Sequence, residues 1–314
     1  MDMKSTTHFI FLLGLAFAVP VGASASTCEE HSNKSACLEP LQESPNNPNS
    51  MTHWAIKFDY DTDGCLPSAA IDPKGQLNPG TNNTGALNGE CAYEDQITYA
   101  NTYYRGFCID ADEVVNKYCA HMYAQYFVKD QTTPGNLVGP AGGHRHDWEF
   151  GMSWDTLNDK EARVLTHATV SAHGKTTTKS VDDIYHEKDA QRGDHPYLVY
   201  HKDGASTHSM RFAKTKDCKS GDKSNPQPCK LNEKPENPTK QWVTATLVNW
   251  FTMVGNAGVT NTDLTRDLTQ ADFGSAIVPM KDETFIKNVM QSVPEGYPNP
   301  DEWQRQFNCG LGKC

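Results

Sequence analysis

The sequence predicts a mainly β protein, a single-domain β-sandwich with a few flanking helices and long loops stapled by disulfides. Runs of alternating polar and apolar residues, rich in β-branched and aromatic side chains, recur through the middle of the chain. Glycine, asparagine, aspartate and proline separate these runs, which is typical of turns between short strands. Helical periodicity is confined to two short segments, and no internal repeat is present.

The expected elements follow from this pattern. The alternation predicts strands at Ala120–Val128, Glu149–Trp154, Ala162–Ala172 and Tyr197–His201. A helix is expected at Ala111–Cys119, which begins with an acidic first turn, and another at Asp282–Gln291, which has apolar residues at 285, 286, 289 and 290. Strands outnumber helices and do not alternate with them, which favours a sandwich.

The first 25 residues have the features of a signal peptide. Lys4 precedes the apolar run Phe9–Val19, and the small-x-small sequence Ala23-Ser24-Ala25 follows. The run is too short to span a bilayer. We therefore expect a secreted, extracellular protein: residues 1–25 are removed, residues 26–50 form a polar N-terminal extension, and residues 51–314 form one domain.

Ten cysteines follow the predicted cleavage point, an even number that suggests up to five disulfides in a secreted chain. No Cys-x-x-Cys is present, which argues against metal-binding cysteines. The sequence alone does not fix the connectivity. Pairing of near neighbours gives Cys28–Cys37, Cys65–Cys91, Cys108–Cys119, Cys218–Cys229 and Cys309–Cys314.

The formal net charge of −11 argues against nucleic acid as a partner, because an acidic protein repels a phosphate backbone. For the same reason, binding to an anionic membrane surface requires a specific pocket or a bridging cation. The sequence gives no sign of oligomerisation, and a monomer is expected.

One short segment concentrates residues that bind metals. Gly143-His144-Arg145-His146-Asp147-Trp148-Glu149 contains two histidines and two carboxylates. Side chains alternate along a strand, so His144 and His146 would share one face and the carboxylates the other. The glycines at 142 and 143 permit an irregular entry, through which His144 can turn toward the carboxylates.

The ligand types leave several interpretations open. His144 and His146 are the start of a tetrahedral zinc site, as in a secreted zinc hydrolase. Asp147, Glu149 and a further carboxylate suit Mg²⁺ or Ca²⁺ better, and Asp130 is the nearest upstream candidate. A solvated strand edge with scattered charges is the simplest alternative. The sequence Asp61-Thr62-Asp63-Gly64-Cys65 resembles the start of a calcium loop, but it lacks the downstream glutamate and is interpreted as a turn.

The segment GHRHDWE at 143–149 matches the heptapeptide of the necrosis- and ethylene-inducing peptide-like proteins, which are secreted effectors of plant-associated microbes. Three other stretches resemble the same family, so that the likeness extends over roughly residues 50–290. They are AHMYAQYFVKD at 120–130, DGCLPSAAIDPKGQLNPG with Cys91, and DHPYLVYHK with THSMRFA at 194–213. The chain resembles a divergent, cysteine-rich member, with Gln125 and Val128 at positions of the usual tryptophan and proline and a longer linker from Asp130 to His144.

The resemblance implies a β-sandwich similar to actinoporins and fungal lectins, with a divalent cation in an acidic cavity. It implies binding to glycosylated inositol phosphorylceramide sphingolipids of the plant plasma membrane, followed by membrane damage and necrosis without catalysis. A non-lytic glycolipid-binding effector or immune elicitor is the second hypothesis. The implied metal ligands are Asp130 and Asp147, with His144, Glu149 and His208 in the same cavity. Gly143, Arg145, His146 and Trp148 are expected to support the fold.

Overall fold

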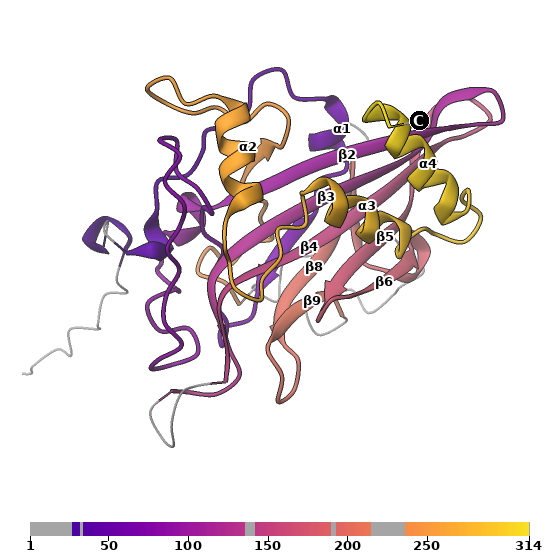
Figure 1. Cartoon of the computed structure of the whole chain (residues 1–314). Helices are drawn as coiled ribbons and strands as arrows, with labels where there is room; N and C mark the ends of the chain where they lie inside the picture. Colours follow the sequence, from indigo (N-terminus) through magenta and orange to yellow (C-terminus); the bar gives the residue numbers. More distant parts are fainter. Residues whose placement is uncertain (1–26, 32–33, 136–141, 190–192, 215–235, 314) are drawn as a thin grey trace, which may run out of the picture.

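The protein, described here from a computed structural model, consists of two β-sheets packed face to face with helices on the outer face of the larger one (Figure 1). The structure describes residues 27–31, 34–135, 142–189, 193–214 and 236–313. The strands are β1 (Lys57–Tyr60), β2 (Asn101–Ala111), β3 (Val114–Gln131), β4 (Gly143–Leu157), β5 (Arg163–Ala172), β6 (Lys175–Ser180), β7 (His186–Asp189), β8 (Gly193–Lys202), β9 (His208–Phe212) and β10 (Thr246–Asn249). The four predicted strands are thus confirmed within β3, β4, β5 and β8.

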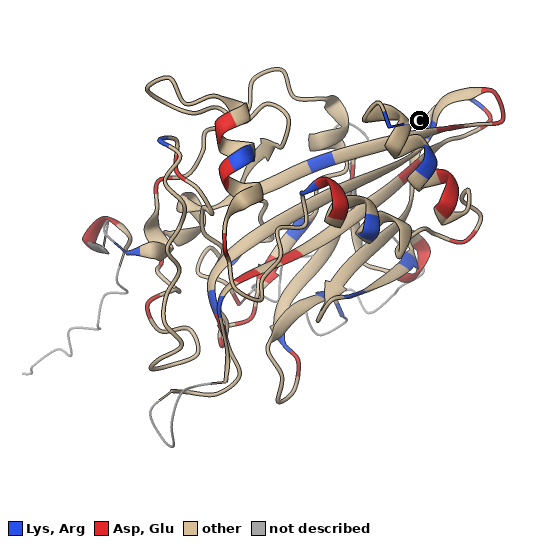
Figure 2. Ribbon diagram, viewed as in Figure 1, with Lys and Arg blue, Asp and Glu red and all other residues tan. Residues whose placement is uncertain are grey.

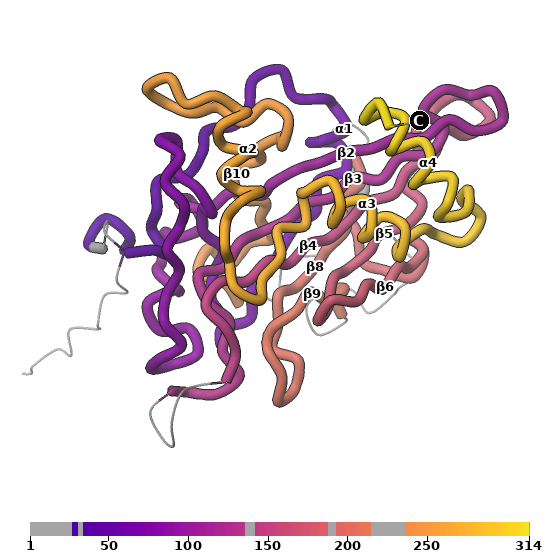
Figure 3. Tube along the Cα trace, viewed as in Figure 1, coloured from indigo at the N-terminus to yellow at the C-terminus, as the bar shows by residue number. Residues whose placement is uncertain are grey.

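The larger sheet has six strands in the order β10-β2-β3-β4-β5-β6. All neighbours from β2 to β6 are antiparallel and follow one another along the chain, so this part is a meander (Figure 3). The edge strand β10 pairs with β2 in parallel. In the smaller sheet β8 pairs in parallel with β1 and antiparallel with both β7 and β9.

The two faces of β4 show how the layers are packed. A Cβ at Gly151 would lie 2.4 Å from Leu198 of β8 and 2.5 Å from Ile56, so the smaller sheet closely covers this face. Trp154, three residues further along β4, points to the other face. There its ring contacts the Trp303 ring edge to face, with the ring centroids 5.4 Å apart. Odd-numbered residues from 147 onward therefore face the smaller sheet and even-numbered ones face the helices.

The helices are α1 (Asn49–His53), α2 (Asn261–Gln270), α3 (Asp282–Met290) and α4 (Pro300–Gly310), with 3₁₀ turns at Glu29–His31, Ser35–Cys37, Gln96–Tyr99 and Val181–Asp183. Helix α3 confirms the helix predicted at 282–291. In Figure 1, α3 and α4 lie across the outer face of the larger sheet. Their apolar residues Phe285, Val289, Trp303 and Phe307 are buried against it. No described helix is long and apolar enough to cross a membrane.

The helix predicted at Ala111–Cys119 is wrong, because this segment is the hairpin between β2 and β3. Ala111 pairs with Val114, and the two residues between them, Asp112 and Glu113, have φ angles of 51° and 65°. Positive φ at both central residues is the geometry of a type I′ turn. The acidic pair that suggested a helical first turn therefore forms the hairpin turn.

Three of the proposed disulfides are present: Cys28–Cys37, Cys65–Cys91 and Cys108–Cys119. Cys218, Cys229 and Cys314 lie outside the described residues, and with them the two other proposed pairs. The described part of residues 26–50 packs onto the domain: Leu41 is buried, and its backbone N–H donates to the Asn101 side chain at 2.9 Å.

Candidate functional site

The β3–β4 hairpin brings the first two candidate ligands together. Asp130 and His144 are register partners next to the connection between these two strands, and Lys129 and Arg145 are the following pair, further from the connection. Asp130 is 2% exposed, so its carboxylate is part of the interior. The number of residues that link Asp130 to His144 does not set the distance between them, because the pairing of the strands does.

A backbone irregularity turns His144 toward the carboxylates. In a regular strand the side chains of His144 and Asp147, three residues apart, point to opposite faces. His146, which lies between them, has a φ of 63°, and Gly143 has a φ of 109°. As a result, donor atoms of Asp130, His144 and Asp147 all lie within 4.8 Å of one another. The irregular entry expected from the glycines is present, with a second break at His146.

His208 of β9 holds Asp130 in place from the smaller sheet. Its backbone N–H donates to Asp130 Oδ2 at 2.7 Å, and its ring Nδ1 donates to Oδ1 at 2.6 Å. Its other ring nitrogen, Nε2, is buried and lies 3.6 Å from Asp63 Oδ1. A Cβ at Gly64 would lie 2.9 Å from this ring, so the Asp-Gly turn is needed for the histidine to fit. His208 thus orients a candidate ligand.

Asp147 and Glu149 are buried carboxylates with hydroxyl partners. Tyr200 of β8 donates to Asp147 Oδ2 at 3.2 Å, and the Ser171 hydroxyl donates to Glu149 Oε2. Burial raises the pKa of Asp147 to about 7, and Asp130 adds to the rise while His144 opposes it. Burial and the charge of Asp147 raise the pKa of Glu149 well above its ordinary value. Two hydroxyls do not neutralise these charges, so the pair favours a bound cation.

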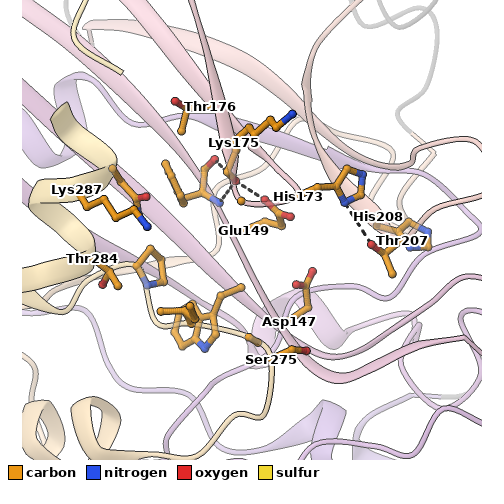
Figure 4. Close-up of a pocket in the computed structure, with 18 of the residues that line it drawn as sticks. Asp147, Glu149, His173, Lys175, Thr176, Thr207, His208, Ser275, Thr284 and Lys287 are labelled. Atoms are coloured by element: carbon orange, nitrogen blue, oxygen red, sulfur yellow. Dashed lines mark hydrogen bonds between the residues drawn. The ribbon is translucent and has the colours of Figure 1, made fainter. Parts of the chain in front are cut away.

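His144, Asp147 and Glu149 lie on the wall of a pocket of about 330 Å³. β5 ends at Ala172 and pairs with β4 only from Gly151 onward, which leaves the outer edge of the heptapeptide uncovered. The β5–β6 turn, β9, the segment before α3 and α3 itself surround this gap (Figure 4). The lining includes His144, Asp147, Glu149, Ser171, His173, Lys175, Thr176, Thr207, His208, Ser275, Ile277, Thr284, Lys287, Asn288 and Gln291.

The donor set fits a hard divalent cation. Calcium–oxygen bonds are about 2.3–2.6 Å long, so donors within 4.8 Å of one another can share one ion. Two carboxylates and one imidazole are rich in oxygen, as Mg²⁺ and Ca²⁺ prefer. A zinc site on His144 and His146 is not formed, because the His146 Nδ1 is bonded to the Tyr126 hydroxyl at 2.6 Å and its ring packs on Phe273.

Comparison with known proteins identifies the family. The family model described as Necrosis inducing protein (NPP1) matches residues 49–292. The chain belongs to this family. Among the relatives, NLP effector protein 2 of Phytophthora capsici is 25% identical over 250 residues, which covers 76% of this chain and 78% of that protein. Necrosis-inducing protein NPP1 of Phytophthora nicotianae is 25% identical over 232 residues, or 73% and 76% of the two chains.

Other matches are partial in sequence or confined to the fold. NLP effector protein 3 of Phytophthora capsici is 32% identical over 125 residues, which spans 38% of this chain and only 46% of that relative. The crystal structure of the non-toxic HaNLP3 protein has a TM-score of 0.58 at 21% identity and covers 83% of this chain and 100% of its own. NLPPya in complex with mannosamine covers 83% and 99%, with a TM-score of 0.57 at 18% identity.

The other heptapeptide residues of this NPP1-family chain lie outside the ligand cluster. A Cβ at Gly143 would lie 2.1 Å from the Asp130 carbonyl oxygen, so only glycine fits there. Arg145 is exposed and donates to Asn82 Oδ1. Burial and the neighbouring Arg145 lower the pKa of His146 to about 4. Trp148 packs on Phe273 at 6.0 Å, on the helical side of the sheet.

The sequence did not single out several residues that shape the site. Tyr200 and Ser171 supply the hydroxyls that contact the carboxylates. Asp63 belongs to the sequence interpreted as a turn, but its position against His208 was not predicted. Lys175 and Lys287 line the pocket from two other elements. For Lys287, the available signal is the polar side of the helix predicted at 282–291.

Proposed function

We propose that this chain is a secreted cytolysin that requires a divalent cation and binds the headgroups of glycosylated inositol phosphorylceramides at the plant plasma membrane, which damages the membrane and causes necrosis. The observation that carries the proposal is the convergence of Asp130, His144 and Asp147, of which His144 and Asp147 line an open pocket. Glu149 and His208 complete the cavity, and Mg²⁺ or Ca²⁺ is the proposed ion.

The electrostatics of the pocket support a role for the cation in recognition. Without the ion, the carboxyl groups of Asp147 and Glu149 give the β4 wall no positive charge to which an anionic headgroup could bind, whether they are protonated or ionised. A bound divalent cation reverses the sign of the local field. Its open coordination positions accept hydroxyl or carboxylate oxygens of a sugar, so recognition needs neither a nucleophile nor a catalytic base.

The comparisons support the same proposal at a coarser level. Relatives of this chain are named necrosis-inducing proteins and effectors. Two solved structures with this fold, those of NLPPya, contain mannosamine and glucosamine. The three disulfides are typical of proteins that work outside the cell.

A second function, a non-lytic glycolipid-binding effector or immune elicitor, is favoured by one comparison. The HaNLP3 protein, which shares the fold, is described as non-toxic. The two functions share the pocket and the ion, and they differ in whether binding leads to leakage. Both are proposed for a monomer that acts from outside the host cell.

Dye release from vesicles of leaf plasma membrane tests the proposal. We expect release by micromolar protein in the presence of Mg²⁺ or Ca²⁺, none after chelation, and recovery when the ion is restored. Asp147→Asn should lose release while its folded spectrum is retained, and Asp159→Asn, which changes an exposed acid in the β4–β5 turn, serves as the matched control. Saturable binding without release would favour the second function, and release unaffected by chelation would contradict the role of the metal.

A further inference from the structure

The wall of the pocket opposite β4 is a polar stripe on α3. Thr284, Lys287, Asn288 and Gln291 line the pocket, at the i, i+3, i+4 and i+7 positions that share one face of a helix. The intervening residues Phe285, Ile286 and Val289 are buried on the other side. The stripe is therefore directed to the pocket by the packing of the helix.

Two contacts fix this helix against the β-sheet. The Thr176 hydroxyl of β6 donates to the Gln291 carbonyl at 3.2 Å, and the Thr178 hydroxyl donates to the Ser292 carbonyl at 2.8 Å. Both tie the C-terminal end of α3 to the strand that begins at Lys175. The position of Lys287 relative to the acidic cluster is thus set by the fold.

The charges of the two walls are opposite. Asp147 and Glu149 lie on the β4 wall, and Lys287 extends from α3 on the other side of the cavity (Figure 4). In Figure 2, β4 carries an acidic stretch, and α3 carries acidic positions in its first turn and a basic position further along. Lys287 and Lys175 are exposed, and within the described residues no carboxylate forms an ion pair with either. Asn288, the next residue of α3, adds an amide to the same wall as Lys287.

We propose that Lys287, together with its neighbour Asn288 on α3, forms an anion subsite that selects ligands carrying a phosphate or carboxylate beside the group bound at the metal. The inference rests on the proposed function, since it adds a site for an anionic group to the pocket that holds the proposed cation. Neutral oxygens of the ligand face the cation on β4, and its anionic group faces α3. An ammonium binds such a group as a point charge, without the geometric demand of a guanidinium.

Soluble sugars test the subsite without a membrane. Calcium-loaded protein is titrated with glucuronate and glucose, and with myo-inositol phosphate and myo-inositol, by calorimetry. We expect each anion to bind more tightly than its neutral partner, and the better of the two anions identifies the source as carboxylate or phosphate. Equal affinity within both pairs would overturn the inference.

Substitutions of Lys287 test whether the preference for anionic ligands arises from α3. Lys287→Ala should reduce the anion preference about fivefold, the upper range for an exposed ion pair, and Lys287→Arg should restore most of it. Lys160→Ala removes an exposed lysine of the β4–β5 turn and controls for net charge. Calcium affinity, measured separately, should be unchanged in all three. An anion preference that survives Lys287→Ala would contradict the assignment.

Vesicle binding separates this inference from the proposed function. If wild-type protein prefers the soluble anions but does not bind vesicles containing glycosylated inositol phosphorylceramide, the subsite stands and the proposed function fails. If it binds these vesicles as tightly as vesicles containing neutral glucosylceramide, the proposed use of the subsite at a membrane is overturned.

Discussion

The strand pair β3–β4 carries a buried histidine–carboxylate cluster at each end, and the two clusters are built differently. At the end away from the β3–β4 connection, Asp155 is fully buried. Its carboxylate accepts from His121 Nε2 at 2.6 Å and is also bound by the Arg163 guanidinium. At the end next to the β3–β4 connection, Asp147 and Glu149 have hydroxyl partners and face a cavity. The charge of Asp155 is therefore compensated by a guanidinium within the protein, whereas Asp147 and Glu149 have only neutral hydroxyl partners.

This difference separates a structural cluster from a candidate site. Cys119, His121 and Asp155 also come within ligand distance of one another, but the Cys119 sulfur is committed to the disulfide with Cys108. Beyond His121, the chain of hydrogen bonds continues to the Tyr104 hydroxyl at 2.9 Å. Proximity of ligand-type residues therefore does not identify a metal site. Uncompensated carboxylates that reach a pocket are the more specific criterion.

The largest effect on stability is expected at the cluster of His121, Asp155 and Arg163. Asp155→Ala removes the anion shared by His121 and Arg163, and breaking a buried pair by removing one partner costs about 3–5 kcal/mol. Urea denaturation should show this loss in the free energy of unfolding. Asp159→Ala, in the neighbouring exposed turn, should change it by less than about 0.5 kcal/mol. A loss below about 1 kcal/mol for Asp155→Ala would remove the distinction between the clusters.

The contribution of Asp147 to the free energy of unfolding should change with pH in the opposite direction from that of a carboxylate in an ordinary ion pair. Burial and Asp130 raise the pKa of Asp147 in the folded, metal-free protein from 3.8 to about 7. The folded state then binds more protons than the unfolded state in this window, so stability is present at low pH and is lost as pH rises toward 7. In metal-free protein, Asp147→Asn should gain stability relative to wild type as pH increases from 4 to 7. Saturating Ca²⁺ should reduce this difference, and a difference independent of pH would contradict the raised pKa.

The smallest effect is expected within the heptapeptide itself. Arg145 is exposed, and its guanidinium contacts the Asn82 side chain outside the ligand cluster. Arg145→Ala should cost less than about 1 kcal/mol of stability, as exposed polar contacts do. Calcium affinity, measured by calorimetry, should stay within twofold of wild type. A tenfold loss of affinity would mean that the whole motif, rather than its ligands alone, forms the site.

The parts of the site that the sequence predicted are those that depend on one pair of strands. Alternation located β3 and β4, and the glycines before His144 indicated an irregular entry. The family resemblance supplied His208. Tyr200, Ser171 and Lys287 were not predicted because their proximity to the carboxylates depends on how the sheets and α3 pack together. The Asp112–Glu113 turn was misassigned because acidic residues favour helix starts and also tolerate this hairpin turn.

The register between Asp130 and His144 has a consequence for the evolution of the protein. Because paired strands fix these two residues from both sides, how they face each other does not depend on the number of residues in the connection between them. A difference in the length of this connection between relatives is therefore compatible with an unchanged register of the candidate ligands on either side.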